Sequence, residues 1–182
     1  MPKGWRLCKN CGESFEKKRP LQAACSIQCS WEWARKLKEK KEKREWTSRK
    51  KELIEKTKTL TDYKKDLQTV FNKFIRSRDK DQPCISCQNP EPKKKNAGHY
   101  KSVGSHPELR FEELNCHLQC EYCNTFLHSN TIEYRKNLIL KIGIKKVEWL
   151  EGNHEPKKYT VQELKDLTKH YKAEIKKLEQ KK

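Results

Sequence analysis

The sequence has few apolar residues and no long apolar run. Hydrophobic residues make up only 33% of the 182 positions, the mean hydropathy is −1.17, and there is a single methionine. No window approaches the roughly 20 apolar residues that a transmembrane helix needs. The start of the chain, Met1 to Arg6, lacks the apolar stretch of a secretory signal. We therefore expect a cytoplasmic protein without a membrane partner.

A chain so poor in apolar residues cannot close a large hydrophobic core. Its length allows one modest domain with appendages, on a prior of roughly 100–200 residues per domain. Another source of stability is therefore required, and the nine cysteines are the obvious candidates. In a reducing cytosol, paired cysteines act as metal ligands rather than as disulfides.

Eight of the cysteines form two modules with the spacing of structural zinc sites. The modules are Cys8-x2-Cys11 with Cys25-x3-Cys29, and Cys84-x2-Cys87 with Cys120-x2-Cys123. A gap of two residues lets one turn direct both thiolates at one ion, and tetrahedral zinc takes four such ligands. We predict two structural Zn²⁺ ions, neither of them catalytic, because four cysteines leave no open coordination position. Cys116 is left over, and we expect it to pack as an apolar thiol.

Positive charge dominates the composition. Lys and Arg number 43 against 25 Asp and Glu, for a formal net charge of +18. A field of this sign attracts polyanions, of which nucleic acid is the commonest in a cell. The excess charge could alternatively serve solubility alone.

The pattern of apolar residues divides the chain into segments 1–30, 31–62, 63–143 and 144–182. Segment 1–30 holds the first cysteine module, and segment 31–62 is rich in Lys and Glu without an apolar stripe. It is typical of a solvated helix or a partly disordered arm. Segment 63–143 contains an amphipathic helix from Tyr63, a break at Pro83, a hairpin with loops, and a helix from Cys123 to a stop at Gly143. In segment 144–182, Thr160 and Glu163 form a capping box that begins the last helix.

Polar residues between the two cysteine pairs of the second module, and just after the second of these pairs, suggest hydrolytic chemistry. They are Asn96, His99, Asn115, His117, Asn124 and His128. A histidine that ends a strand, an asparagine before a knuckle cysteine and a polar residue directly after the next cysteine resemble an HNH nuclease. The resemblance implies a ββα-metal fold over roughly residues 84 to 135.

The same residues suit phosphodiester hydrolysis on chemical grounds. His99 could be the general base, since its unperturbed pKa lies near neutrality. Asn115 would orient the ring by a hydrogen bond. Asn124 and His128 are four positions apart, so on a helix they would share one face and could hold one Mg²⁺ or Mn²⁺ ion.

Each of these residues also has an ordinary structural interpretation. His99 could lie in a simple turn, Asn115 and Asn124 could cap, and His128 could be a surface residue. Many HNH enzymes have a metal ligand directly before the base, where this chain has Gly98. Asn96 or His117 could then supply the missing ligand.

Longer motifs resemble the phage NinG/Rap family over nearly the whole chain. The motifs are Pro83-Cys84-Ile85-Ser86-Cys87, Ala97-Gly98-His99-Tyr100, Leu109-Arg110-Phe111, Asn115-x-His117-x-Gln119-Cys120 and Cys123-Asn124, after the helix end Phe74-Ile75-Arg76-x-Arg78-Asp79. This resemblance implies a recombination endonuclease that cuts branched DNA, including Holliday junctions and D-loops. It further implies an infected bacterial cell as the location, near the nucleoid, and phage or host recombination proteins as partners.

Basic and aromatic residues near these motifs could contact DNA. The candidates for phosphate contacts are Lys93, Lys94, Lys95, Lys101, Arg110 and Arg135. In the first cysteine module, Trp5, Phe15, Trp31 and Trp33 could either grip DNA or only pack.

The sequence therefore predicts an α+β protein with a zinc-stapled HNH core, flanking long helices and an N-terminal zinc module. The expected function is metal-dependent cleavage of branched DNA, with a homodimer as a reasonable assembly because junction resolution uses two active sites. The main alternative is a non-enzymatic zinc-binding adaptor for nucleic acid, and a third is a phage assembly factor.

Overall fold

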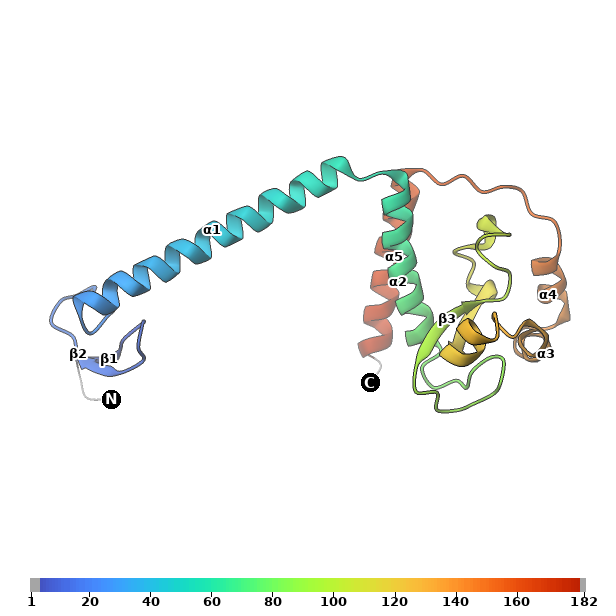
Figure 1. The fold of residues 1–182 in the computed structure, drawn as a ribbon, viewed down its shortest axis with the longest axis horizontal. Coiled ribbons are helices and arrows are strands. Elements are labelled where there is room, and N and C mark those ends of the chain that lie inside the picture. Colours follow the sequence, from blue (N-terminus) through green and yellow to red (C-terminus); the bar gives the residue numbers. More distant parts are fainter. Residues whose placement is uncertain (1–3, 181–182) are drawn as a thin grey trace. The chain divides into compact units, whose positions relative to one another are not determined.

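The structure is a computed structural model that describes residues 4–180. The chain divides into two compact units, Met1–Lys58 and Thr59–Lys182. Across the described residues the fold is mixed α and β, with two small sheets and several helices (Figure 1). Among the same residues, no helix combines the length and apolar character needed to cross a membrane.

The first unit consists of a small hairpin followed by a long helix. Strand β1 (Trp5–Leu7) pairs antiparallel with β2 (Ser14–Glu16). Helix α1 (Ile27–Thr57) begins where Ser26 Oγ accepts a hydrogen bond from the Cys29 amide. None of its residues is buried. The lysine-rich segment is thus a solvated helix, one of the two interpretations that its composition allowed.

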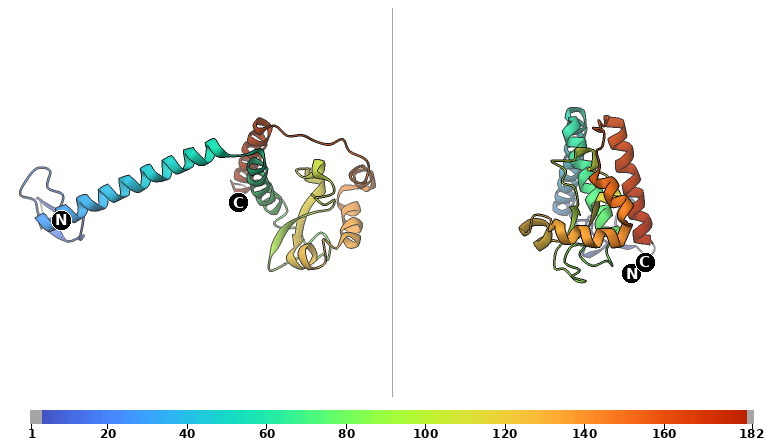
Figure 2. Two further views of the ribbon diagram at one scale, coloured as in Figure 1. Left: turned by 45° about the horizontal axis from the view of Figure 1, so that its top comes forward. Right: turned by 90° about the vertical axis from the view of Figure 1, so that its right-hand side faces the viewer.

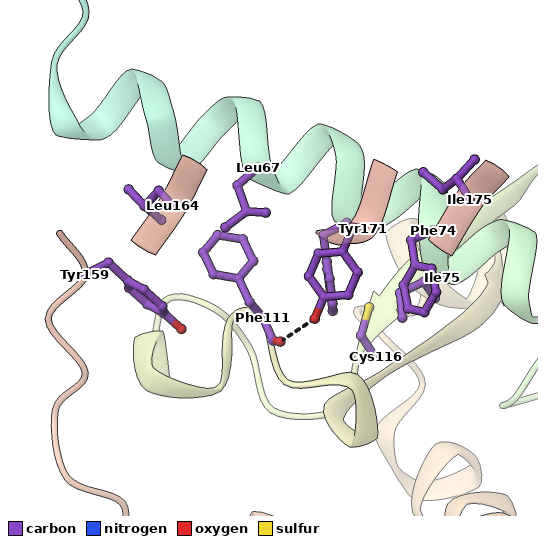
Figure 3. Close-up of a cluster of buried hydrophobic side chains, with 10 residues drawn as sticks. Leu67, Phe74, Ile75, Phe111, Cys116, Tyr159, Leu164, Tyr171 and Ile175 are labelled. Atoms are coloured by element: carbon purple, nitrogen blue, oxygen red, sulfur yellow. Dashed lines mark hydrogen bonds between the residues drawn. The ribbon is translucent and has the colours of Figure 1, made fainter. Parts of the chain in front are cut away.

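Two helices that are far apart in sequence form one side of the second unit. Helix α2 (Leu60–Arg78) and helix α5 (Val161–Gln180) lie side by side in all views (Figures 1 and 2). Each has a clear apolar face, and together they bury Leu67, Phe74 and Tyr171 (Figure 3). The hydroxyl of Tyr171 donates to the Phe111 carbonyl, which joins the helix pair to the loop beneath it. Segment 144–182 therefore shares a core with the hairpin region.

The second sheet is a short hairpin between these helices and a second helical layer. Strand β3 (Lys95–His99) pairs antiparallel with β4 (Cys116–Cys120), and His99 lies opposite Cys116. A π-helical turn (Tyr122–Phe126) follows, then α3 (Thr131–Ile142) and α4 (Ile144–Glu151). Side chains alternate along a strand, so His99 and Cys116 face α2. Gly98 and His117, its partner on β4, lie on the other face, beside α3.

The helix expected from Cys123 begins later than the sequence suggested. After the π-helical turn, His128, Ser129 and Asn130 all have positive φ angles, and the α-helix starts only at Thr131. The predicted stop at Gly143 is confirmed, with φ of +87°, a conformation that favours glycine. The capping box at the start of α5 is also present, since Thr160 and Glu163 each bind the other's backbone amide.

Candidate functional site

The four cysteines of the second module meet at one point and fit a zinc ion. Their Sγ atoms all lie within 4.8 Å of one another, and the Cys87 and Cys120 sulfurs are 3.8 Å apart. Tetrahedral zinc with Zn–S bonds near 2.3 Å requires sulfurs about 3.8 Å apart. Burial alone would raise the pKa of Cys84, but N–H groups from the Cys120 and Cys87 backbone outweigh it and lower that pKa. The cluster could therefore hold zinc, as the spacing predicted.

The first module forms a similar cluster in the other unit. Cys11 and Cys25 have sulfurs 3.7 Å apart, and those of Cys25 and Cys29 are 3.6 Å apart. Backbone N–H groups, chiefly that of Cys11, lower the pKa of Cys8 to about 6. This cluster could also hold zinc. Of the nearby aromatic residues, Phe15 is buried beside the cysteines, whereas Trp31 is 70% exposed.

His99 ends β3, and its ring orientation is set by a backbone carbonyl. Its Nε2 lies 3.0 Å from the Arg110 carbonyl oxygen, and because a carbonyl only accepts, Nε2 carries the proton. The unprotonated Nδ1 is left with its lone pair, 3.8 Å from the Cys116 thiol. Burial against Phe71 and its surroundings lowers the pKa of His99, so the ring is neutral at pH 7. Cys116 is fully buried, the packed thiol that the sequence predicted.

Asn115 acts on the loop around His99 and not on the ring itself. Its Oδ1 accepts from the Lys101 amide at 2.8 Å, and its Nδ2 donates to the carbonyls of Lys101 and Leu109 at 3.0 and 3.1 Å. The expected bond to the imidazole is therefore replaced by a clamp that closes the loop between β3 and β4. That loop supplies the Arg110 carbonyl, so Asn115 positions His99 indirectly.

Gln119 joins three parts of this region, a role that the sequence did not predict. Its fully buried Nε2 donates to Ser86 Oγ at 2.7 Å, within the zinc knuckle, and to the Ser129 carbonyl at 2.6 Å. Its Oε1 has no hydrogen-bond partner among the described residues and lies against Gly98. A side chain at position 98 would collide with this amide. The only signal in the sequence was the alternation Asn115-x-His117-x-Gln119, which places polar residues at every second position. All three are buried in the structure.

Asn124 and His128 do not share one face of a continuous helix, so this expectation was wrong. Asn124 lies in the π-helical turn, and His128 follows it in a left-handed conformation with φ of +46°. The Ser129 amide donates to the Asn124 carbonyl at 3.3 Å and closes the turn between them. Asn124 is half-buried and His128 is exposed, so both side chains could still offer a ligand atom to a metal ion on this turn.

His117 belongs to a buried ionic network. Its Nε2 lies 3.1 Å from the Leu114 carbonyl and its Nδ1 lies 3.0 Å from the Arg78 guanidinium, so both ring nitrogens are engaged. Arg78 also forms a paired contact with Asp79, which accepts from the Leu118 amide. The network attaches the end of α2 to β4 and makes His117 unsuitable as a metal ligand. Asn96, the other candidate, lies opposite Gln119 on β4.

The basic residues proposed to contact DNA differ in whether their charged groups already contact another residue of the protein. Lys94 pairs with Glu121, Lys95 donates to the Lys80 carbonyl, and Lys93 is exposed. Arg110 donates to Gln68 at 2.7 Å, and Lys101 lies over the Tyr100 ring.

Arg135 is held by a carboxylate instead of being free for a phosphate. Its guanidinium contacts both oxygens of Glu151, at 2.7 and 3.0 Å, and lowers the pKa of Glu151 to about 2. The Tyr100 hydroxyl donates to the same carboxylate. Glu151 therefore ties the loop after His99 to α3 and α4, which was not anticipated because Glu151 is distant in sequence.

These features define a protein with two four-cysteine clusters that could bind zinc, one of them fastened to a buried β-hairpin. The chain matches the family model described as Bacteriophage Lambda NinG protein over residues 2–181, and it belongs to that family. This confirms the NinG part of the resemblance seen in the sequence.

Several curated proteins are similar to this chain. "Protein ninG" of Escherichia phage lambda and that of Salmonella phage P22 are each 40% identical over 114 residues, 63% of this chain and 56% of the relative. "Protein ninG" of Enterobacteria phage H19B is 42% identical over 101 residues, 56% of this chain and 50% of the relative. The chain spans about half the length of the curated relatives it matches. No solved structure matches.

Proposed function

We propose that this protein is a metal-dependent endonuclease of the HNH type that cleaves branched DNA. The observation that carries the proposal is the fixed tautomer of His99, with Nε2–H held by the Arg110 carbonyl and a lone pair left on Nδ1. A neutral imidazole in this state is what a general base requires. The order of two antiparallel strands, a cysteine knuckle and a helix is consistent with the ββα arrangement that the sequence resembles.

In this proposal the chain's own residues bind the substrate and move one proton. Nδ1 of His99 takes the proton of the attacking water, while the Arg110 carbonyl stabilises the proton on Nε2. Asn115 keeps that carbonyl in place through the loop. The oxygen and nitrogen donors of Asn124 and His128 suit a Mg²⁺ or Mn²⁺ ion, which would neutralise the charge that develops on the phosphate. Cleavage should fall as the pH drops below the lowered pKa of His99, because the protonated ring cannot accept a proton.

Branched DNA is proposed as the substrate because of the family resemblance and the charge of the chain. Lys101 and Arg110 lie in the loop between β3 and β4, and Lys93 lies just before β3; all three could contact phosphates without regard to sequence. A homodimer would supply two active sites for a four-way junction, and recombination proteins of phage or host are the proposed partners. The two cysteine clusters would hold the fold, because four thiolates leave no position for a substrate.

The test compares His99→Ala with His170→Ala, an exposed histidine on α5, as the matched control. Each zinc-loaded protein is incubated with a labelled four-way junction in Mg²⁺ or Mn²⁺. His99→Ala should keep its zinc and its junction affinity but lose cleavage by on the order of a hundredfold or more, the usual contribution of a positioned base. His170→Ala should cut at the wild-type rate. Equal cleavage by both variants would exclude His99 as the base.

A non-enzymatic DNA-binding adaptor is the second candidate, and one observation favours it. Nδ1 of His99 faces the buried Cys116 thiol, so a water must displace this contact before the ring can act. Binding of the junction by wild-type protein without cleavage in any divalent ion would support the adaptor.

A further inference from the structure

The charges on α1 are sorted onto different faces of the helix. One face carries ion pairs between residues four apart, Arg35 with Glu39, Lys38 with Glu42, Lys41 with Glu45, and Lys56 with Glu52. Residues at this separation are neighbours on a helix surface, so these lysines and arginines have a carboxylate beside them. Their positive charge is therefore partly cancelled locally.

A second face of α1 carries cations that form no ion pair in the described part of the structure, although Glu39 and Glu55 lie four residues from Lys43 and Lys51. Lys40, Lys43, Arg44, Thr47, Ser48 and Lys51 line one shallow surface depression. Their separations of three and four residues place them in a single stripe along the helix. Within residues 4–180, no ion pair joins a cation of this stripe to an acidic side chain. All six residues are exposed. The side chains of the lysines, Arg44 and Ser48 can donate hydrogen bonds to an anion, whereas the Thr47 hydroxyl already donates to the Lys43 carbonyl.

We propose that this basic stripe of α1, defined as Lys40, Lys43, Arg44, Thr47, Ser48 and Lys51, is a binding site for the phosphate backbone of duplex DNA. A duplex carries one negative charge per roughly 1.7 Å of its axis, so it offers a continuous line of anionic groups to a row of cations. At 1.5 Å per residue the stripe is roughly 16 Å long, so several phosphates lie within its reach. Lysine, arginine and hydroxyl groups are the usual donors to phosphate oxygens, and they carry no sequence preference of their own.

The stripe is independent of the residues proposed for cleavage. It lies in the first unit, whereas His99 lies in the second. It would therefore supply affinity for DNA whether the protein cuts its substrate or only binds it. Failure of the nuclease proposal leaves this site untouched, and failure of this site leaves cleavage in place, although at higher protein concentration.

The experiment compares two triple variants that remove the same charge from different faces of one helix. The stripe variant is K40Q/K43Q/K51Q, and the matched control is K38Q/K41Q/K56Q, whose lysines are paired with glutamates. Binding of a fluorescently labelled linear duplex is measured by anisotropy over a series of KCl concentrations. Circular dichroism and zinc analysis verify that both variants remain folded.

The stripe variant should bind on the order of a hundredfold more weakly near 0.1 M salt, and its slope of log K against log salt should be smaller by about 2–3 units. This follows from a slope of about 0.9 for each phosphate that the protein neutralises. The control should change the slope by less than about one unit. Equal changes in both variants would show that only net charge matters, and an unchanged stripe variant would place DNA elsewhere; either outcome overturns the proposal. Binding of the stripe to phosphatidylserine vesicles, with no loss of DNA affinity in the variant, would likewise overturn it.

Discussion

Adding one methyl group at Gly98 should destabilise the second unit strongly. An ideal Cβ at this position would lie 2.1 Å from Oε1 of Gln119 and 2.9 Å from its Cβ. Gln119 has no room to withdraw, because it is fully buried and its amide donates to Ser86 and Ser129. Overpacking costs about 1–3 kcal/mol, and leaving the buried amide donor unsatisfied costs about 1–3 kcal/mol more. We expect Gly98→Ala to lower the free energy of unfolding by roughly 2–6 kcal/mol.

Thermal unfolding of the zinc-loaded protein measures this loss. For a unit of this size, one kcal/mol corresponds to a shift in Tm of roughly 3–5 °C, so a fall of roughly 6–30 °C is expected. Gly104→Ala is the matched control, because a Cβ at Gly104 meets nothing within 4 Å. It should leave the Tm unchanged within about 2 °C.

A double variant separates the collision from a general effect on the strand. Gln119→Ala removes the obstacle, so Gly98→Ala should cost less in that background, with a coupling of about 1–3 kcal/mol. The assignment of this close contact would be refuted if Gly98→Ala unfolds at the wild-type temperature. It would also be refuted if the losses of stability from Gly98→Ala and Gln119→Ala simply add in the double variant.

Two further predictions concern the metal clusters and the buried ion pair. Purified protein should contain two zinc ions per chain by atomic absorption. The Cys87→Ser variant should contain one zinc ion and lose the near-UV signal of the hairpin region. A single zinc ion in the wild type would show that one of the two clusters does not bind zinc. Burial would raise the pKa of Asp79, but His117 and Arg78 outweigh it and hold that pKa well below its usual range. The ion pair therefore contributes stability that is fully present above about pH 4 and is lost as the pH falls below that value. Asp79→Asn should lower the free energy of unfolding by about 3–5 kcal/mol at pH 7. Its stability should also fall less steeply than that of the wild type as the pH is lowered. If the stability of both proteins falls equally with pH, the ion pair does not make this contribution.

Local spacing in the sequence determined the metal clusters and most helices. Each cysteine pair needs only a short turn to converge, so the spacing alone was enough to match Cys84-x2-Cys87 with Cys120-x2-Cys123. The capping box of Thr160 and Glu163 was predictable for the same reason, because both partners lie within four residues. The apolar stripes of α2 and α5 were visible in the sequence, although their pairing with each other was not.

The chemistry around His99 depended on contacts between distant residues. The sequence marked His99 and Asn115 as functional candidates, but only the tertiary structure decided that Arg110 holds the ring and that Asn115 clamps the loop. It also decided that positive φ angles after the π-helical turn separate Asn124 from His128. Hydrogen bonds across a folded loop leave no periodic trace in the sequence, because they join backbone groups that every residue possesses. The sequence by itself therefore determined which residues could act, and the packing of the hairpin between its helices decided which atoms they meet.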